Sequence, residues 1–480
     1  MVTNNSFTSL IAPVIPIIND INAHSGIAYL VGGAVRDIVL KRIIKDGDIE
    51  VHGLTLESLE AILKKYGPVS LVGKQFGVLR LHGTNIDWSL PRRDSKGRKP
   101  TIEVDPAMTI EQACRRRDIT INAMALNLNP IAANWENKAH ASNFDIIDPY
   151  GGLDAIAHQE LRAVDQELFL QDPLRFFRVM HFIGRFEMMP DAALNKLCAT
   201  IELADLVTGK PLAQERIFEE IKKLFLLSRS PSRGVRWLAS INRLQEIFPE
   251  LHALIGIKQR PDYHPEGDVF EHTMQALDAA ARFSYYQDSA TTSANEEKLS
   301  IMLAVLCHDL GKATHTDEHL CCKGHEAAGI DPAKKLLSRL TNNTSIEKMV
   351  ITLITHHTAP YIFVQGNAGA KAYKRLAIKL SPYTSLRQLG LVALADLQGR
   401  RAQGPEPLTF HTDFFEDFIR RATKSFVVDH AEPPVLLGRH LADAVEPGPK
   451  MGALLKKAYD LQIEEGISDW QELKRRVLKQ

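Results

Sequence analysis

Two short runs near the N-terminus combine glycine and carboxylates at a spacing that suits phosphate chemistry. The run Leu30-Val31-Gly32-Gly33-Ala34-Val35-Arg36-Asp37 leads into an expected helix, and Asp46-Gly47-Asp48 follows nine residues later. Backbone N–H groups at a glycine turn can approach a phosphate, toward which the helix presents its positive end. Asp46 and Asp48 are two apart at the start of an expected strand, so their carboxylates share one face. Together these features favour a Mg²⁺ site shared with substrate phosphates over a plain turn beside a solvated acidic strand.

A third carboxylate is expected from a neighbouring strand. Asp87 lies in Ile86-Asp87-Trp88-Ser89-Leu90, after the first two carboxylates and before a basic segment at residues 91–99. The cations of that segment are Arg92, Arg93, Lys96, Arg98 and Lys99. A charged loop of this kind can contact the phosphates of a nucleic acid, although a solvated loop is the simpler explanation.

A second basic cluster, Arg115-Arg116-Arg117-Asp118, runs into an apolar segment. We expect a core strand over residues 119–127. A core strand leaves the close grouping of Arg117, Asp118 and Asn122 unexplained. Arg117 offers a cation that could bind a phosphate, Asp118 an acceptor for a ribose hydroxyl, and Asn122 an orienting amide.

Gln171-Asp172-Pro173-Leu174-Arg175 marks the start of an expected helix, with proline in the first turn. Helix capping alone would account for Asp172. However, Asp172, Arg175 and Arg178 are spaced by three residues and can share a helix face. An acceptor-only aspartate beside a donor-only arginine matches an amino group next to a ring nitrogen, the pattern of adenine and cytosine. Such a pair could select A and C without a nucleic-acid template.

These motifs, in this order, resemble those of the class II tRNA nucleotidyltransferases, the family of bacterial CCA-adding enzymes and their poly(A) polymerase relatives. The likeness is continuous over about the first 235 residues. It rests on five motifs: Gly32-Gly33-Ala34-Val35-Arg36-Asp37, Asp46-x-Asp48, Arg116-Arg117-Asp118-Ile119-Thr120-Ile121-Asn122-Ala123, Asp172-Pro173-Leu174-Arg175 and Glu215-Arg216-Ile217.

The resemblance implies a role for each matching residue. Asp46 and Asp48 would hold two Mg²⁺ ions, and Asp87 would help deprotonate the RNA 3′-hydroxyl. Glu215 and Arg216 would brace the base-selecting helix. By the same resemblance, Asp118 would contact the ribose, Arg178 the phosphates, and Asp172 with Arg175 the base. The full set of expected nucleotide-binding residues is Gly33, Arg36, Arg117, Asp118, Asn122, Asp172, Arg175 and Arg178.

Three positions depart from the family pattern. Gln171 replaces the usual glutamate before Asp-Pro-Leu-Arg, and an uncharged amide can still orient Arg175. Ile119 stands where phenylalanine is usual, and Lys41 occupies a customary glycine position. The first departure affects a supporting contact, the second the volume of an apolar site, and the third only a turn.

The second half of the chain carries a separate set of metal-ligating residue types. His272, His308-Asp309 and Asp396 resemble the ligand signature of the HD-superfamily phosphohydrolases, with no ligand missing. Imidazole and carboxylate ligands suit a transition metal such as Mn, Ni or Co. Such a metal could activate water to hydrolyse a phosphoester. Three further histidines resemble the accessory ligands of two-metal members, or serve as substrate contacts or surface residues: His325, His356 and His357.

Composition limits the remaining possibilities. The 480 residues carry 58 basic and 58 acidic side chains, so any nucleic-acid surface must be local rather than uniform. Five cysteines form no disulfide framework, and the spacing around Cys321-Cys322 does not suit a zinc finger. No run is long enough to span a membrane, and the N-terminus does not read as a secretory signal. We therefore expect a cytoplasmic protein without a membrane partner; its oligomeric state does not follow from the sequence.

The expected fold class is α+β followed by all-α. Short β-rich runs alternate with helices up to about residue 150, and helical periodicity dominates from Gln159 onward. The resemblance implies a polymerase β-like nucleotidyltransferase palm with a small mixed sheet, an all-α neck and an α-helical HD domain. The expected domains are residues 1–155 (palm), 156–245 (neck), 246–402 (HD domain) and 403–480 (tRNA-binding tail). An exposed loop is expected at residues 288–297.

We therefore predict a template-independent nucleotidyltransferase that adds C and A to tRNA 3′ ends from CTP and ATP with Mg²⁺, with an additional HD phosphohydrolase. The nearest alternatives are a poly(A) polymerase and an enzyme adding only CC or only A. A phosphohydrolase that uses the first half to bind RNA is a third alternative, and a non-catalytic RNA chaperone is a fourth. The sequence does not identify the HD substrate or its metal.

Overall fold

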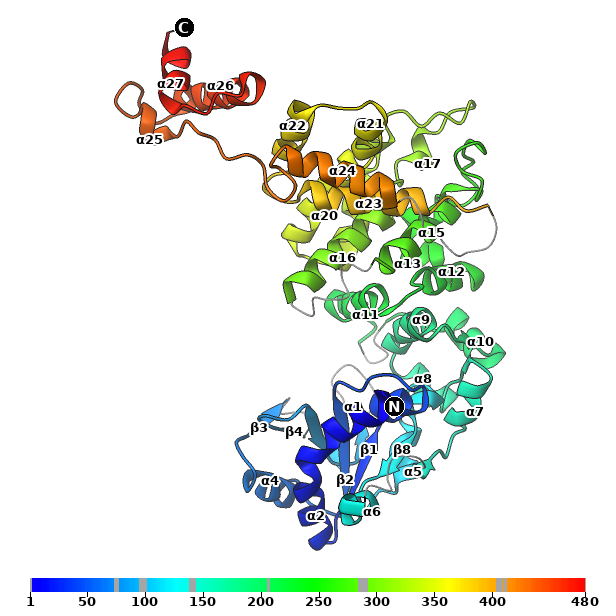
Figure 1. Cartoon of the computed structure of the whole chain (residues 1–480). Coiled ribbons are helices and arrows are strands. Elements are labelled where there is room, and N and C mark those ends of the chain that lie inside the picture. Colours follow the sequence, from blue (N-terminus) through cyan, green and yellow to red (C-terminus); the bar gives the residue numbers. More distant parts are fainter. Residues whose placement is uncertain are drawn as a thin grey trace. The chain divides into compact units, whose positions relative to one another are not determined.

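A computed structural model describes residues 2–72, 77–94, 102–137, 144–204, 208–283, 292–402, 408 and 412–479 (Figure 1). The chain divides into two compact units, Met1–Ile221 and Lys222–Gln480. The finer division into four domains stays a prediction. The expected cations Lys96, Arg98 and Lys99 lie outside the described residues.

The first unit is built on a mixed sheet of seven strands in the order β3-β4-β5-β2-β1-β8-β9. β2 and β5 pair in parallel, and the other neighbours pair antiparallel. The strands are β1 (Ile27–Val31), β2 (Gly47–His52), β3 (Val69–Val72), β4 (Val78–Leu81), β5 (Ile86–Ser89), β8 (Ala125–Asn127) and β9 (Ile146–Ile147). Two further pairs are β6 (Arg92–Asp94) with β7 (Ile102–Val104) and β10 (Glu160–Leu161) with β11 (Met189–Pro190).

The two faces of this sheet differ in chemistry. Apolar side chains such as Leu30, Ile49 and Trp88 join the core with α1 (Val2–Ile11) and α2 (Ile15–Ala23), which cross one face in Figure 1. Because side chains alternate along a strand, the residues between these apolar ones point to the other face. Among them are Asp48 and Asp87, so the sheet carries the carboxylates opposite the α1–α2 layer.

The expected strand over residues 119–127 is wrong in its first half. Thr120–Asn122 forms a 3₁₀ turn, and the strand β8 begins only at Ala125. The Asp118 carboxylate accepts hydrogen bonds from the Ile119 backbone N–H and the Asn122 amide. These local bonds compete with strand pairing and account for the turn.

The remaining helices of the first unit surround the sheet and continue beyond it. α9 starts at the Asp172-Pro173 motif and is the longest helix wholly inside this unit among the described residues. The helices are α3 (Gly33–Val39), α4 (Leu56–Lys64), α5 (Ile110–Arg115), α6 (Asn129–Ala133), α7 (Gly152–Ala157), α8 (Gln166–Leu170), α9 (Leu174–Phe186), α10 (Ala192–Thr200) and α11 (Gln214–Leu227), which runs across the division between the units.

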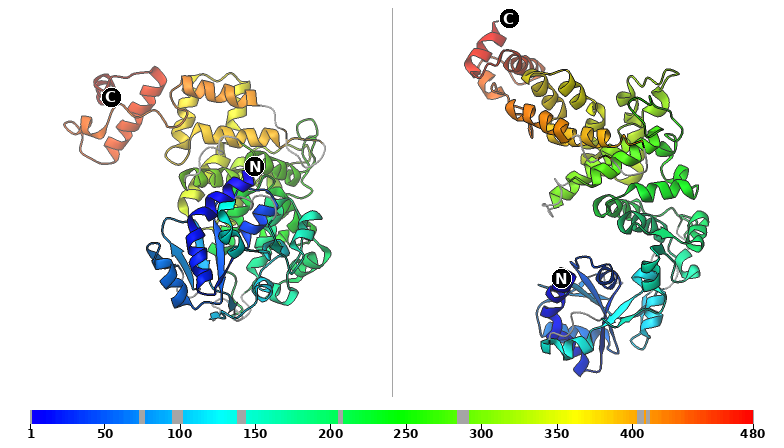
Figure 2. Two further views of the ribbon diagram at one scale, coloured as in Figure 1. Left: turned by 60° about the horizontal axis from the view of Figure 1, so that its bottom comes forward. Right: turned by 45° about the vertical axis from the view of Figure 1, so that its right-hand side comes forward.

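The described residues of the second unit form helices and connecting loops, as Figure 2 shows from two further sides. Its helices are α12 (Ser232–Ser240), α13 (Leu244–Ile247), α14 (Pro249–His252), α15 (Val269–Ala281), α16 (Thr292–Cys307), α17 (Lys312–His315), α18 (His325–Ala328), α19 (Ile330–Leu340), α20 (Thr344–His356), α21 (Ala359–Gln365), α22 (Ala370–Leu380), α23 (Leu386–Gln398), α24 (Thr412–Lys424), α25 (Gly438–Leu441), α26 (Pro449–Glu465) and α27 (Trp470–Leu478). α25, α26 and α27 share an apolar cluster of their own.

The expected class, α+β followed by all-α, is confirmed. The loop expected at residues 288–297 is wrong from Thr292 onward, where α16 begins, and residues 288–291 lie outside the described part. Within the described residues, no helix combines the length and apolar character needed to cross a bilayer.

Candidate functional sites

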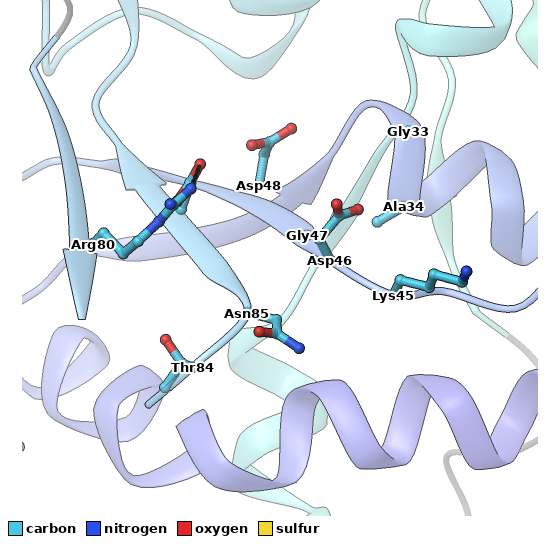
Figure 3. A pocket seen from close by; sticks show the side chains of 10 residues that line it. Gly33, Ala34, Lys45, Asp46, Gly47, Asp48, Arg80, Thr84 and Asn85 are labelled. Atoms are coloured by element: carbon cyan, nitrogen blue, oxygen red, sulfur yellow. Dashed lines mark hydrogen bonds and ion pairs between the residues drawn. The ribbon is translucent and has the colours of Figure 1, made fainter. Parts of the chain in front are cut away.

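The three predicted carboxylates of the first unit line one pocket. Its volume is about 480 Å³, and Asp46, Asp48 and Asp87 share its wall with the start of α3. Figure 3 shows Asp46 and Asp48 near Gly33 and Ala34. The other lining residues are Gly33, Ala34, Lys45, Gly47, Arg80, Thr84 and Asn85. Oxygen ligands of this kind suit Mg²⁺, so the residues present fit the predicted metal.

Strand register explains why residues 39 positions apart meet here. Asp48 in β2 pairs with Asp87 in β5, and Asp87 pairs with Arg80 in β4. Directly paired residues point to the same face of a sheet. Arg80, Asp87 and Asp48 therefore form one row across three strands, and Asp46 immediately precedes β2.

Arg80 forms a two-pronged ion pair with Asp87. Its Nε lies 2.6 Å from Oδ1 and its Nη2 lies 2.7 Å from Oδ2. The sequence reasoning did not single out Arg80. Its alternation with Leu79 and Leu81 marks an outward-facing strand position, but the partner strand cannot be read from that pattern.

The pocket perturbs Asp48. Desolvation raises the pKa of this carboxyl, Arg117 opposes the shift, and the charges of Asp87 and Asp46 add to it. Arg117 reaches this region because Gly32 has no side chain: a Cβ there would lie 2.5 Å from Arg117 Nη1. Gly32 also has φ +70°, a region that favours glycine.

A hydrogen-bonded network joins the predicted residues Asp118, Asn122, Arg178 and Arg36; Arg178 is partly exposed and the other three are buried. Arg178 Nε donates to Asp118 Oδ2 at 2.6 Å, and Asn122 Nδ2 donates to Asp118 Oδ1 at 3.0 Å. Arg36 Nη1 in turn donates to Asn122 Oδ1 at 2.6 Å. Burial would raise the pKa of Asp118, but Arg178 and Asn122 outweigh it and hold that pKa well below its usual range. The network links α3, the turn after α5, and α9.

Asp172 and Arg175 lie at the start of α9. Asp172 Oδ1 accepts from the Leu174 backbone N–H at 3.2 Å and lies 3.8 Å from Arg216 Nη2 on α11. Arg175 Nη2 donates to the backbone carbonyl of Arg116 at 2.6 Å. Its guanidinium is therefore held against the segment that carries the Asp118 network.

Glu50 is a buried residue of this region that the sequence reasoning missed. It accepts from Arg116 Nη2 at 3.0 Å and from His52 Nε2 at 3.0 Å. Burial opposes ionisation, but His52 and Arg116 prevail and lower the pKa of Glu50 to about 2. The signal available was its position two residues after Asp48, on the same strand face.

In the second unit, the four residues of the HD signature converge. His272 Nε2 lies 3.2 Å from Asp396 Oδ1 and 3.6 Å from Asp309 Oδ2. His308 Nε2 lies 3.3 Å from Asp309 Oδ2 and 3.3 Å from His272 Nε2. Adjacent ligand atoms about 2.1 Å from a shared metal are separated by roughly 3 Å, so this donor set fits a bound transition metal.

Two of the three accessory histidines join the same cluster from the other side of Asp309. His325 Nε2 lies 3.3 Å from Asp309 Oδ1, and His357 Nε2 lies 3.8 Å from it. These three residues form a second group that could hold a metal. His356 belongs to none of the three groups of potential metal ligands found among the described residues, and it is half-buried at the end of α20.

The Nδ1 atoms of the four clustered histidines have acceptors outside the cluster. His308, His325 and His357 donate to the backbone carbonyls of Val305, Cys322 and Ile354 at 2.7, 2.8 and 2.7 Å, respectively. His272 donates to Glu266 at 2.8 Å and to Gly399 O at 3.1 Å. An Nδ1–H bond of this kind fixes the tautomer whose Nε2 is free to bind metal.

Glu266 is a further residue that the sequence reasoning missed. Its carboxylate is buried and accepts from both His264 Nδ1 and His272 Nδ1 at 2.8 Å. Burial opposes ionisation, but these two histidines lower the pKa of Glu266 to about 2. No spacing rule connects Glu266 with His272, so sequence alone offered no signal for it.

Cations adjoin both carboxylates of the cluster. Lys312 Nζ lies 2.7 Å from Asp309 Oδ2, and Arg400 Nη2 lies 2.8 Å from Asp396 Oδ1. Both cations line a pocket of about 190 Å³ beside the cluster. The full lining is Lys258, Gln259, Arg260, Tyr263, His264, Lys312, Thr316, Leu320, Cys322 and Arg400.

Comparison with protein families identifies three segments. Residues 28–162 match the poly(A) polymerase head domain, residues 202–255 a probable RNA- and SrmB-binding site of polymerase A, and residues 269–380 the HD domain. The predicted family resemblance is confirmed.

Relatives span most of the chain. A multifunctional CCA protein of Mannheimia succiniciproducens is 32% identical over 382 residues, covering 78% of this chain and 84% of that protein. A multifunctional CCA protein of Acidovorax ebreus is 30% identical over 452 residues, covering 92% and 96%.

Solved structures share the fold at lower identity. A Bacillus stearothermophilus CCA-adding enzyme in complex with CTP has a TM-score of 0.61 and 19% identity, covering 98% of this chain and 97% of that one. A Thermotoga maritima CCA-adding enzyme complexed with tRNA has a TM-score of 0.54 and 16% identity, covering 98% and 95%.

Proposed function

The chain belongs to the multifunctional CCA protein family, and from that premise we propose that it adds C and A to tRNA 3′ ends without a nucleic-acid template. CTP and ATP are the nucleotide substrates. The observation that carries the proposal is the pocket in which Asp46, Asp48 and Asp87 meet beside the glycine turn. A poly(A) polymerase or an enzyme adding only CC or only A would share this pocket, so product length separates these alternatives.

Asp46 and Asp48 are proposed to hold Mg²⁺. When bound there, the metal would offset the charge of the attacking and leaving oxygens during in-line displacement. Asp87 accepts the proton of the RNA 3′-hydroxyl, and Gly33 keeps the start of α3 open to the triphosphate. Arg117, which approaches through the space at Gly32, contributes a cation for the phosphates.

The Asp118 network is proposed to hold the nucleotide. Asp118 accepts from the ribose hydroxyl, and Arg178 contacts the phosphates from α9. Asn122 orients Asp118, and the buried Arg36 orients Asn122 through the hydrogen bond described above. Arg36 therefore acts on the nucleotide through its neighbours.

Asp172 and Arg175 are proposed to read the incoming base. The Asp172 carboxylate accepts from the exocyclic amino group of cytosine or adenine, and Arg175 donates to the adjacent ring nitrogen. The hydrogen bond from Arg175 to the Arg116 carbonyl connects this base-recognition pair to the segment that carries the Asp118 network. Arg216, near Asp172, limits the motion of that carboxylate.

A second activity, hydrolysis of a phosphoester, is proposed for the HD cluster. The observation that favours it is that all four clustered histidines use Nδ1 to donate a hydrogen bond to a group outside the cluster. Each Nε2 therefore faces the carboxylates of the cluster. His272, His308, Asp309 and Asp396 would hold one transition metal, and Asp309, His325 and His357 a second. Such metals would lower the pKa of a bound water.

The proposed partners follow from this pair of activities. Residues 403–480 would contact tRNA, and localised phosphate contacts make tRNA binding fall with salt despite the zero net charge. We place the protein in the cytoplasm.

The test is incubation with a tRNA transcript lacking CCA, Mg²⁺ and labelled CTP and ATP, singly and together. Addition that stops after three nucleotides supports the proposal. Stopping after two, adding a single A, or producing a long ATP ladder would identify the CC-adding, A-adding or poly(A) alternative. If no nucleotide is added to the tRNA under any of these conditions, the transferase assignment is refuted.

Two variants serve as reciprocal controls. Asp46→Ala should abolish addition while preserving phosphoester hydrolysis. His308→Ala should abolish hydrolysis of 2′,3′-cyclic AMP and p-nitrophenyl phosphate while preserving addition. Loss of both activities in either variant would contradict the assignment of the two reactions to separate residues.

A further inference from the structure

The transferase pocket contains its own cation on the row of paired residues that carries the carboxylates. Arg80 is the direct cross-strand neighbour of Asp87, which is the neighbour of Asp48. Two hydrogen bonds, at 2.6 and 2.7 Å, join the Arg80 guanidinium to both oxygens of Asp87. Figure 3 shows Arg80 approaching from the strand opposite the glycine turn.

The contribution of this ion pair to folding stability is expected to be small. The Arg80 side chain is 51% exposed and that of Asp87 is 30% exposed. Exposed ion pairs contribute little to folding, and the sheet is already joined there by β4–β5 backbone pairing. The pair does, however, offset the repulsion among three carboxylates in one pocket.

We propose that Arg80 is the internal counter-ion of the transferase carboxylates and that a divalent metal bound at Asp46 and Asp48 displaces it from the neighbouring Asp87. This inference rests on the proposed metal-binding role of the pocket. The forked guanidinium occupies a lone pair on each Asp87 oxygen, and its charge repels a cation that arrives at the neighbouring Asp48.

Arg80 thereby weakens metal binding in the absence of nucleotide. Once displaced, its guanidinium stays within the pocket wall as an unpaired cation, available to a substrate phosphate. The arrangement couples metal binding to nucleotide binding, because the nucleotide phosphates give the displaced Arg80 guanidinium a new negatively charged partner.

The experiment measures Mn²⁺ binding to the full chain by electron paramagnetic resonance without nucleotide. Binding that Asp46→Asn removes is assigned to the transferase pocket, which separates it from the HD cluster. Arg80→Gln should tighten that binding about 2- to 5-fold, the worth of an exposed ion pair, and Arg80→Lys, which cannot form the fork, should tighten it less.

Lys45→Gln is the matched control. Lys45 lines the same pocket, and no ion pair is recorded for it among the described residues. It therefore reports the general effect of removing one positive charge. In an Asp87→Asn background, Arg80→Gln should no longer tighten binding beyond Lys45→Gln.

Each outcome decides the matter. Tightening in Arg80→Gln that exceeds Lys45→Gln and depends on Asp87 supports the inference. Equal effects of the two variants, or an excess that persists with Asp87→Asn, overturn it while leaving the proposed function intact. If Asp46→Asn removes no Mn²⁺, the proposed metal role itself fails, and this inference fails with it.

Discussion

Replacing Glu50 by glutamine should destabilise the first unit by an amount that depends on pH. The pKa of Glu50 is lowered to about 2 from an ordinary value of 4.5, a difference worth about 3 kcal/mol at 1.36 kcal/mol per unit. Because the folded pKa is the lower one, this stability is fully present above pH 4.5 and is lost as pH falls through 2. By the same relation, only about 1.4 kcal/mol remains at pH 3.

The assay is urea unfolding with pulsed hydrogen exchange and mass spectrometry, read on peptides covering β1 and β2. Peptide resolution is needed because two compact units need not unfold together. Glu50→Gln should cost about 3 kcal/mol at pH 7 and about half of that at pH 3. Glu60→Gln is the matched control, since Glu60 pairs with Lys64 on the exposed face of α4 and should change stability by less than about 0.5 kcal/mol.

A loss that is equally large at pH 7 and pH 3 would refute this reasoning, because it would trace the effect to packing rather than to the charge. No loss at pH 7 would also refute it, by showing that Arg116 and His52 need no buried partner. The expected result has a functional counterpart: Arg116 precedes Arg117 and Asp118, so Glu50→Gln should also weaken nucleotide binding.

Three further outcomes are expected. Gly32→Ala should raise the KM for nucleotide about 10-fold, because the new Cβ would lie 2.5 Å from Arg117 Nη1 and displace a charged hydrogen-bond donor; an unchanged KM would separate Arg117 from the phosphates. His357→Ala should lower the transition metal retained after dialysis by about one equivalent per chain, as measured by plasma mass spectrometry, whereas His356→Ala should retain it. Arg216→Ala should raise UTP misincorporation about 2- to 5-fold by freeing Asp172, and unchanged fidelity would exclude that restraint.

The transferase carboxylates could be predicted from the sequence because each lies in a short motif at the start of, or within, a strand whose side chains alternate between faces. Asp46 and Asp48 are two residues apart in the chain, and their place on one wall of the pocket follows from the two-residue period of a strand. The meeting of Asp87 with Asp48 depends instead on a parallel β2–β5 pairing, which no local pattern encodes. For the same reason Arg80, fixed only by the β4–β5 register, was missed.

Local side-chain hydrogen bonds explain where strand prediction failed. The alternation of apolar residues from Ile119 is that of a strand, yet Asp118 binds the Ile119 N–H and the Asn122 amide and bends the chain. The residues that misled the strand prediction are the same ones that suggested a nucleotide site. A polar group that overrides an apolar pattern is therefore itself a functional signal.

Charge balance in this protein is local as well as global. The chain carries equal numbers of acidic and basic residues, and a carboxylate in or next to each proposed metal site has a cation of its own: Asp87, beside Asp48, has Arg80, and Asp396 has Arg400. Bringing carboxylates together without metal costs free energy through repulsion, and such pairs lower that cost. Metal binding must then exchange one positive partner for another, which leaves an arginine beside the bound metal. Both proposed reactions act on phosphates, and an arginine released at that point is the donor that a phosphate binds best.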